Sequence, residues 1–190
     1  MAHDTAAAVV GATGGIGRAL VAALAADGRY GVVHALSRSG EPAPGARAGT
    51  IDIGDEESIR AAASRVAEGL PLRLVIVATG LLHGPDLMPE KSWRDLDPER
   101  LATAFRVNAI GPALVAKHLL PLLPRSGRSV FAALSARVGS IGDNRLGGWY
   151  GYRASKAALN QILRNAAIEL ARSKPRPSAS ASIRARWRPG

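Results

Sequence analysis

A glycine-rich turn near the start of the chain constrains the fold more than any other feature. It reads Gly11-Ala12-Thr13-Gly14-Gly15-Ile16-Gly17, after a short apolar run from Ala6 to Val10 and at the start of an Ala/Leu-rich stretch from Ile16 to Ala26. The apolar run is typical of a buried strand, and the stretch is typical of a helix that ends at Gly28. A strand, a glycine turn and a helix in this order form the arrangement that binds a dinucleotide pyrophosphate.

The glycines of this turn have separate expected roles. Gly11 allows the tight turn, Gly15 lets the backbone approach the phosphates, and Gly17 lets the helix pack closely on the strand. A tight glycine turn without a ligand is the alternative. Three glycines at these positions, between a strand and a helix, favour the nucleotide site.

Strand and helix patterns alternate along the chain, which predicts an α/β fold: a Rossmann-type, doubly wound parallel sheet with helices on both faces. Further strands are expected at residues 30–36, 50–53, 72–78 and 129–134, and further helices at residues 55–68, 97–120 and 149–171. Asp97 followed by Pro98 is a good helix start, and Gly111-Pro112 predicts a bend in that helix. A chain of 190 residues fits one domain with a sizeable core.

Tyr152 and Lys156 lie four residues apart, which puts both side chains on one face of a helix. A phenol keeps its proton to a pH of about 10, and a nearby ammonium group lowers that pKa by favouring the phenolate. The pair is therefore a candidate proton donor and acceptor near neutral pH. The spacing also occurs by chance, and Lys156 could be a solvated helix residue; the glycine turn upstream gives the pair its weight.

Three further segments follow the glycine turn in a characteristic order. They are Ala78-Thr79-Gly80 after the expected fourth strand, Val107-Asn108-Ala109-Ile110-Gly111, and Ser135 followed by Tyr152-x-x-x-Lys156. Together, from about Ala6 to Leu170, these pieces resemble the short-chain dehydrogenase/reductase family. The run from Ser135 to Tyr150 further resembles its C-factor branch, related to sniffer-type carbonyl reductases.

The resemblance implies hydride transfer between a nicotinamide and a carbonyl or alcohol. Tyr152 would give its proton to the carbonyl oxygen, while Lys156 would lower the phenol pKa and bind the nicotinamide ribose. Ser135 would orient the carbonyl, and Asn108 would hold a water that links Lys156 to solvent. Asn108 could instead satisfy backbone groups in the bend, and Ser135 could cap a strand end.

Two positions depart from the family pattern. Ala78 stands where an asparagine is usual, which removes a bracing contact for the sheet and no chemical group. The family serine commonly lies about a dozen residues before the tyrosine; Ser135 lies 17 before Tyr152, and Ser140 lies 12 before it. We favour Ser135 because it leaves the end of a strand, where ligand sites occur in such sheets, and Ser140 stays open.

The end of the second expected strand bears on the choice of cofactor. Leu36-Ser37-Arg38-Ser39 carries no acid for a ribose 2′-hydroxyl, whereas a guanidinium and two hydroxyls suit a 2′-phosphate. NADP(H) is therefore favoured over NAD(H), with an exposed loop arginine as the alternative. The expected cofactor-binding residues, several of them from the resemblance, are Gly11, Thr13, Gly14, Gly15, Ile16, Gly17, Ser37, Arg38, Asp52, Ile53, Ala78, Thr79, Gly80, Asn108, Tyr152 and Lys156.

The resemblance stops after Leu170, before the family's last strands and its substrate segment. Residues 171–190 hold six basic residues and no acid, out of a net charge of +10. We expect residues 1–172 to form an NADP-binding domain with the catalytic residues, and residues 173–190 to form a basic, disordered tail. The sheet would then lack its last strands, through either a natural short form or a reading-frame error. A nucleic-acid arm is not favoured, because Trp187 is the single aromatic residue in the tail.

Two functions from different classes follow. One is an oxidoreductase that moves hydride between NADP(H) and a small carbonyl or alcohol; the alternative is a non-catalytic nucleotide-binding or signalling protein, favoured by the missing substrate segment. The absence of cysteine excludes disulfides and thiolate metal sites, and no metal is expected. No apolar run approaches the ~18 residues of a membrane span, so we expect a cytoplasmic protein. The resemblance also allows a homo-oligomer.

Overall fold

The computed structural model describes residues 4–84, 88–173 and 182–184. Its strands are β1 (Ala6–Val10), β2 (Val32–Ser37), β3 (Arg47–Thr50), β4 (Leu72–Val77), β5 (Val130–Ala133) and β6 (Ser182–Arg184). Its α-helices are α1 (Gly15–Asp27), α2 (Glu56–Ala67), α3 (Pro98–Phe105), α4 (Gly111–Leu119) and α5 (Tyr150–Ser173). Strands and helices alternate, as the sequence predicts.

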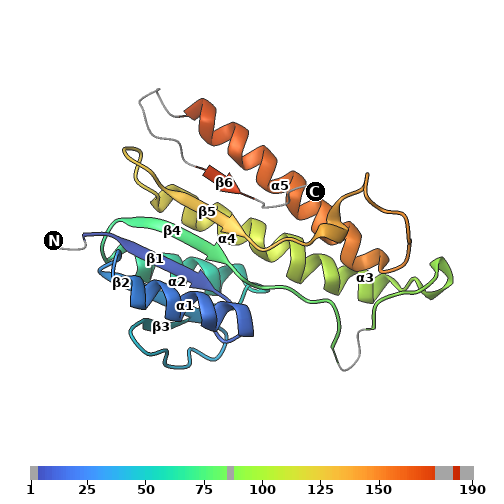
Figure 1. The fold of residues 1–190 in the computed structure, drawn as a ribbon, viewed down its shortest axis with the longest axis horizontal. Coiled ribbons are helices and arrows are strands. Elements are labelled where there is room, and N and C mark those ends of the chain that lie inside the picture. Colours follow the sequence, from blue (N-terminus) through green and yellow to red (C-terminus); the bar gives the residue numbers. More distant parts are fainter. Residues whose placement is uncertain (1–3, 85–87, 174–181, 185–190) are drawn as a thin grey trace.

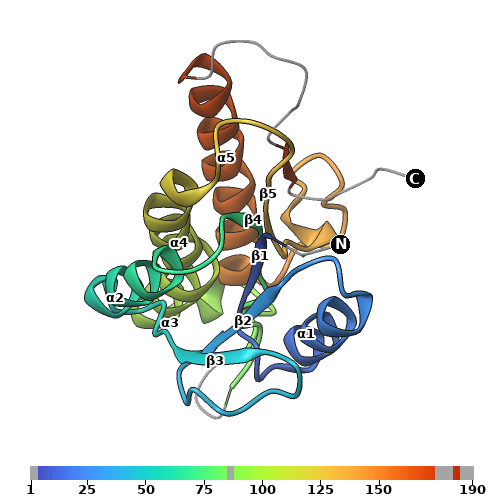
Figure 2. The same ribbon diagram turned by 90° about the vertical axis from the view of Figure 1, so that its left-hand side faces the viewer.

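The strands form a parallel sheet in the order β3-β2-β1-β4-β5-β6. Helix α1 covers one face, and α2, α3, α4 and α5 lie on the other (Figures 1 and 2). The predicted Rossmann-type, doubly wound fold is therefore confirmed. The chain reverses its direction of winding between β1 and β4, which is the point where such sheets bind ligands.

Two apolar cores lie on the two faces of the sheet. The larger core packs Phe131 of β5 against buried side chains of the helices, including Ile59, Leu119 and Leu159. The smaller core packs Val21 of α1 against the sheet. β1 is buried along its whole length, as a strand covered on both faces requires.

Local sequence signals set most helix ends where the sequence predicts them. Asp55 caps α2 by accepting a hydrogen bond from the Glu57 N–H, and Asp97 caps α3 by accepting one from Arg100. Helix α1 ends at Gly28, whose φ of 67° lies in the left-handed region that glycine adopts without strain.

The third strand is displaced from its expected position at residues 50–53. It runs from Arg47 to Thr50 and pairs with His34–Ser37 of β2. The prediction followed the apolar residue Ile51, which is buried but lies just beyond the strand. At the edge of a sheet, main-chain pairing sets the strand, and Arg47 needs no apolar partner there.

The helix expected at residues 97–120 is divided by a π-helical segment, Arg106–Ile110. Pro112 follows it in the first turn of α4 and has no N–H, so the ordinary i+4 donor to the Asn108 carbonyl does not exist. The bend expected at Gly111-Pro112 thus takes the form of a wide helical turn directly before the proline.

The expectation of no strand in the C-terminal segment is wrong at residues 182–184. These residues form β6, which pairs in parallel with Val130–Ala132 of β5. Pairing at an edge uses backbone groups alone, so a three-residue strand needs no apolar pattern to form. The rest of the expected tail beyond Ser173 lies outside the described residues. In the part of the chain that the structure describes, no helix is long and apolar enough to cross a membrane.

Candidate active site

A cleft of about 690 Å³ opens at the carboxyl ends of β1, β2 and β4, at the switch point of the sheet. It brings together most of the expected cofactor residues from four separate stretches of sequence. Its lining includes Gly11, Thr13, Gly14, Ser37, Arg38, Asp52, Ile53, Ala78, Thr79 and Gly80.

The glycine turn forms the floor of this cleft. Gly11 has a φ of 89°, and a Cβ on Gly17 would lie 2.0 Å from the Gly11 carbonyl oxygen, so this turn excludes any larger residue at position 17. A Cβ on Gly15 would meet nothing within 4 Å, so the backbone is open there. Ile16 is 62% exposed and is not among the residues lining the cleft.

The start of α1 is built to receive an anion. Its N-cap is Gly14, which makes no side-chain capping bond, and its first turn holds no acid. The helix therefore presents unpaired N–H groups and the positive end of its dipole toward the cleft. The Thr79 hydroxyl, in the facing wall, is buried without a partner among the described residues. These features fit the pyrophosphate of a dinucleotide.

The end of β2 holds a polar cluster around Ser37. The Ser37 Oγ accepts the Gly40 N–H at 3.1 Å and lies 3.4 Å from the Ser39 Oγ. Ser39 in turn donates to Glu41 Oε1 at 3.2 Å, and Arg18 binds the other oxygen of Glu41 at 3.0 Å.

Leu36–Ser39 carries no acid, as predicted, but Glu41 from the following loop brings a carboxylate to the same place. The loop after β2 returns this carboxylate to the cluster, where it neutralises Arg18. Glu41 lies two residues after Ser39, outside the segment on which the cofactor prediction was based. Arg38 lines the cleft and is exposed, and it forms no ion pair with a described residue.

The far wall of the cleft adds residues that the sequence analysis missed. Thr103, Arg106 and Val107 line it together with Asp52 and Ile53. Their i, i+3, i+4 spacing puts them on one side of the helical segment, which is the signal that could have revealed them. The Asp52 carboxylate accepts the Gly54 N–H at 2.8 Å, so one of its oxygens is engaged in its own turn.

The Tyr152–Lys156 pair lies on one face of α5, as its spacing predicts. Lys156 is 2% exposed, and its Nζ donates to the Leu134 carbonyl oxygen at 2.9 Å. The same Nζ lies 5.8 Å from the centroid of the Tyr152 ring. Lys156 therefore joins α5 to the end of β5.

The protonation of this pair differs from the sequence expectation. Burial raises the pKa of Tyr152, and burial lowers the pKa of Lys156 to about 8. The expected lowering of the Tyr152 pKa by Lys156 is wrong in this structure, because the ammonium group is bound to the Leu134 carbonyl and the phenol is half-buried. In both residues, burial favours the neutral form.

Asn108 is fully buried and ties three segments together. Its Oδ1 accepts the Leu81 N–H, and its Nδ2 donates to the Leu81 carbonyl, both at 2.8 Å. The Nδ2 also donates to Ser155 Oγ at 3.2 Å, and Ser155 donates to the Tyr152 carbonyl at 2.9 Å. The side chain thus links the loop after β4 to the turn of α5 that holds Tyr152.

Gly80 joins this group to the cleft. It lines the cleft, and a Cβ placed on it would lie 3.5 Å from Lys156 Nζ and 3.7 Å from Asn108 Oδ1. Lys156 and Asn108 therefore lie directly behind Gly80, which lines the same cleft as the glycine turn before α1.

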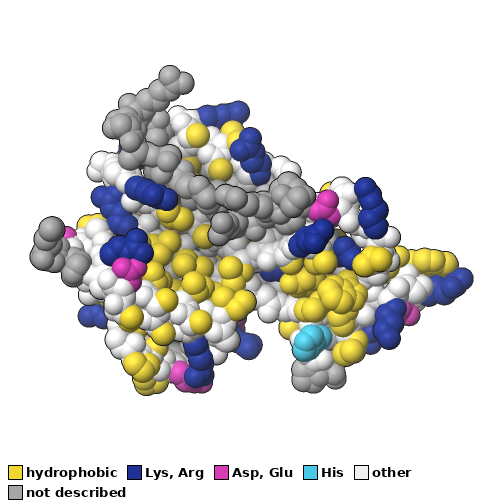
Figure 3. Space-filling view, viewed as in Figure 1, with side chains coloured by type: hydrophobic (Ala, Val, Ile, Leu, Met, Phe, Trp, Pro, Cys, Tyr) yellow, Lys and Arg dark blue, Asp and Glu magenta, His cyan; other side chains and the backbone are white. Residues whose placement is uncertain are grey.

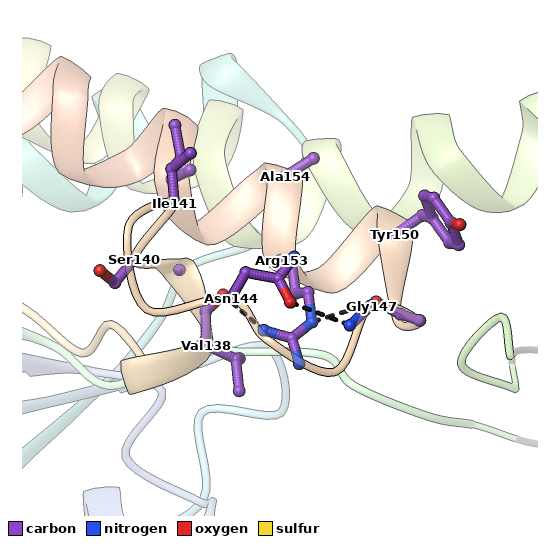
Figure 4. A pocket seen from close by; sticks show the side chains of 11 residues that line it. Val138, Ser140, Ile141, Asn144, Gly147, Tyr150, Arg153 and Ala154 are labelled. Atoms are coloured by element: carbon purple, nitrogen blue, oxygen red, sulfur yellow. Dashed lines mark hydrogen bonds between the residues drawn. The ribbon is translucent and has the colours of Figure 1, made fainter. Parts of the chain in front are cut away.

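The two candidate serines lie on different sides of α5. Ser135 follows Leu134, the partner of Lys156, and its Oγ is buried without a partner among the described residues. Ser140 lines a separate cavity of about 400 Å³ with Tyr150, Arg153 and Ala154, and Tyr152 and Lys156 are not among the residues that line it (Figure 4). Arg153 braces that cavity by donating to the Gly148 and Val138 carbonyls. This geometry favours Ser135.

The parallel sheet, the glycine turn at its switch point and the cleft above it define a Rossmann-fold protein. A family model described as Enoyl-(Acyl carrier protein) reductase matches residues 11–179. The chain belongs to the short-chain dehydrogenase/reductase family.

Known proteins resemble the chain over different lengths. It is 32% identical over 117 residues to a 1-hydroxy-2-glutathionyl-2-methyl-3-butene dehydrogenase of Rhodococcus sp. (strain AD45), covering 59% of this chain and 46% of the relative. It is 40% identical over 76 residues to C-signal of Myxococcus xanthus, covering 40% of this chain and 46% of the relative.

A solved structure agrees over most of the chain. A short-chain dehydrogenase/reductase from Burkholderia multivorans with bound NADP superposes with a TM-score of 0.76 at 30% identity, covering 88% of this chain and 74% of that one. The matches with the two curated relatives above span about half the length of each.

Proposed function

We propose that the protein is an oxidoreductase that moves hydride between NADP(H) and a small carbonyl or alcohol compound. One observation carries the proposal: the buried Lys156, with Tyr152 beside it, lies behind Gly80, in the wall of a cleft that is also lined by the uncapped start of α1. A dinucleotide that spans such a cleft has its phosphates at α1 and its nicotinamide toward Lys156 and Tyr152.

The residues present fit that cofactor. The α1 N–H groups and Thr13 would hold the pyrophosphate, and Ile53 would pack on the adenine. Lys156 would bind the nicotinamide ribose past Gly80, which has no side chain to separate the Nζ from the cleft. When bound, the nicotinamide supplies the hydride, which the protein's own groups cannot.

Tyr152 supplies the proton. Burial raises its pKa, so the phenol stays protonated across the neutral range and donates from Oη to the carbonyl oxygen of the substrate. Lys156, with its pKa near 8, is mostly an ammonium ion at pH 7 and would serve through its hydrogen bond to the nicotinamide ribose. The unpartnered Ser135 Oγ would donate a hydrogen bond to the same carbonyl oxygen.

NADP(H) is proposed over NAD(H). Arg38 lines the cleft without an ion-pair partner among the described residues, and Ser37 and Ser39 lie beside it. A 2′-phosphate would pair with such a guanidinium. The Burkholderia multivorans structure with bound NADP supports the same choice.

The substrate is proposed to be apolar around its carbonyl group. Large apolar side chains are exposed on the two loops beside α5: Met88 and Trp93 at about two-thirds, and Ile141 and Leu146 at 84% and 91%. Figure 3 shows hydrophobic side chains gathered on the side of the molecule that carries these loops. We place the protein in the cytoplasm, where NADPH is available, and we propose a homo-oligomer as its assembly.

The test is NADPH oxidation with a panel of aldehydes and ketones, comparing the wild type with Tyr152→Phe. The wild type is expected to turn over at least one aromatic or branched carbonyl compound, and Tyr152→Phe is expected to lose about 10²–10⁴-fold in kcat. Equal rates for the two proteins would remove the enzymatic proposal.

A second candidate is a nucleotide-binding protein with a signalling role, which the similarity to C-signal supports. It keeps the cleft and needs no turnover. NADPH binding in calorimetry, without oxidation of NADPH by any carbonyl compound, would favour this candidate over the first.

A further inference from the structure

Helix α5, which carries Tyr152 and Lys156, begins in an unusual way. Gly147, Gly148 and Trp149, the three residues before it, have φ values of 65°, 64° and 51°. The left-handed region is unfavourable for a residue with a side chain, so Trp149 is held there by its surroundings. Trp149 also has no side-chain oxygen with which to cap the helix.

Glu90, from a loop about sixty residues earlier, supplies the missing cap. Its Oε2 accepts the Gly151 N–H at 3.2 Å, and its backbone carbonyl accepts the Trp149 N–H at 2.5 Å. The Glu90 side chain is 6% exposed, so its charge is held at the positive end of the helix dipole.

The approach of Glu90 is close enough to restrict the sequence of α5. A Cβ on Gly151 would lie 3.0 Å from Glu90 Oε1, and a Cβ on Gly148 would lie 3.3 Å from the Glu90 carbonyl oxygen. Both positions hold glycine. The carboxylate and the start of the helix are therefore fitted to one another.

This clamp bears directly on Tyr152. The ring of Trp149 meets the ring of Tyr152 edge to face, with centroids 6.4 Å apart and an interplanar angle of 74°. Tyr152 follows Gly151, whose N–H Glu90 accepts, and its own carbonyl is bound by Ser155. The clamp holds both the backbone before Tyr152 and the ring beside it.

We propose that Glu90 is a positioning residue: it fixes the start of α5 and thereby sets the orientation of the Tyr152 ring. The consequence for turnover rests on the proposed oxidoreductase function, whereas the clamp itself does not. Glu90 touches neither reacting group, and it acts through Gly151 and Trp149.

The experiment compares Glu90→Ala, which removes the carboxylate, with Glu90→Gln, which keeps an acceptor oxygen in the same place. Glu99→Ala is the matched control, because Glu99 is an exposed acid in the first turn of α3. The ring of Tyr152 is followed by NMR on tyrosine-labelled protein, in which the chain has three tyrosines and Tyr152→Phe assigns the signal. Hydrogen exchange of the Gly151 amide is measured on the same samples.

In Glu90→Ala, we expect the Gly151 amide to exchange at least about 10-fold faster and the Tyr152 ring signal to lose its shift from Trp149. We expect kcat to fall about 10²-fold, the effect of a misplacement of about 1 Å, with the NADPH KM unchanged within about twofold. Glu90→Gln is expected to restore all three readouts to within about threefold, and Glu99→Ala to leave them unchanged.

Each other result has one meaning. Unchanged exchange and ring signal in a folded Glu90→Ala would overturn the clamp. A changed ring signal with an unchanged kcat would overturn its role in positioning. If the wild type has no activity but Glu90→Ala still changes the ring signal, the clamp is supported and the oxidoreductase function is the part that fails. If Glu90→Ala does not fold, Glu90→Asp takes its place, because its shorter side chain withdraws the carboxylate from the Gly151 N–H. Faster Gly151 exchange and a displaced Tyr152 signal in that variant support the clamp, and wild-type values for both overturn it.

Discussion

Lys156 is buried, and burial disfavours its charged ammonium form. Its pKa falls from 10.5 to about 8 on burial, so between those values the unfolded chain binds more protons than the folded one. The free energy of unfolding therefore rises with pH across this window. The full penalty, roughly 3 kcal/mol from the size of the shift, is present below pH 8.

This sign leads to a prediction for Lys156→Met. The variant is expected to have a larger free energy of unfolding than the wild type at pH 7, because the penalty for burying the charge is gone. The lost hydrogen bond to the Leu134 carbonyl reduces this gain. The gain is expected to shrink by pH 9.5, where the wild-type lysine is neutral in the folded protein. Urea unfolding at pH 7.0, 8.5 and 9.5 measures this difference. The exposed Lys91→Met is the control, and parallel pH curves for Lys156→Met and the wild type would contradict the prediction.

Arg38 gives a prediction about the choice between NADPH and NADH. Arg38→Ala is expected to raise the KM for NADPH roughly 10–100-fold, the loss of a charge-assisted hydrogen bond, and to leave the KM for NADH within about twofold. Arg164→Ala, an exposed arginine on α5, serves as the control. A similar rise in both KM values would show that Arg38 does not read the phosphate.

Glu41→Gln is expected to act in the opposite direction. The substitution removes a carboxylate that now engages Ser39 and Arg18, which frees both for a phosphate. We expect NADPH affinity to increase about threefold at low salt, and this gain to diminish at high ionic strength. Calorimetry at two salt concentrations is the measurement, and weaker binding in the variant would argue against a phosphate in this cluster.

At the scale of elements, the wide turn before Pro112 is the feature that most affects the site. It contains Asn108, whose amide binds both backbone groups of Leu81 and the hydroxyl of Ser155. A regular helix would move these groups out of register with α5. The glycine–proline pair predicted a bend, but the sequence could not show that the bend directs Asn108 toward Leu81.

Asn108→Ala is expected to destabilise the protein by about 2–4 kcal/mol. The change leaves the N–H and carbonyl of Leu81 without their partner inside a buried site, and each unpaired group costs about 1–3 kcal/mol. Chemical unfolding measures the loss. Asn165→Ala, an exposed position with one side-chain hydrogen bond, is expected to change stability by less than about 0.5 kcal/mol; an equal loss in both variants would contradict the account.

The same scale shows what the sequence could and could not predict. The β1 strand, helix α1 and the cap at Asp97 were predictable because apolar runs, glycine turns and capping acids act locally. The position of β3 was not, since pairing with β2 sets it and Ile51 is buried without being in the strand. The Glu90–Gly151 contact joins residues 61 apart and leaves no local pattern.

At the scale of the whole molecule, the packing of α1 on β1 depends on the contact between Gly17 and Gly11. The space between Gly17 and the Gly11 carbonyl cannot hold a methyl group, because its carbon would lie 2.0 Å from the oxygen. Gly17→Ala is therefore expected to displace α1 from β1, with a loss of stability above about 3 kcal/mol and loss of NADPH binding. Thermal unfolding and calorimetry measure the two effects.

Gly28→Ala is the matched control for this prediction. It also replaces a glycine at an end of α1, but a Cβ on Gly28 would meet nothing within 4 Å. The only unfavourable effect of the alanine is the strain of a φ of 67°. We expect a loss of about 1 kcal/mol with normal NADPH binding. Similar losses at both positions would show that the strand–helix contact is not the cause.

The global topology was predictable from the sequence, whereas the contacts between side chains in the cleft were not. Alternation of strands and helices, with parallel pairing, leaves few ways to wind the chain, and the ligand cleft follows from the point where the winding reverses. Which side chains meet in the cleft depends on loop paths. The sequence therefore located Gly11, Ser37 and Thr79 in one cleft, but it missed Arg106 and Glu41.

The bare hydrogen of Gly80 sets how much room lies between the cleft and Lys156. An alanine there would fit without a clash, since its Cβ would lie 3.5 Å from Nζ, but under the proposed function it would occupy the space through which Lys156 reaches the cofactor. Drift at this one codon could therefore leave a stable, folded descendant that has lost turnover.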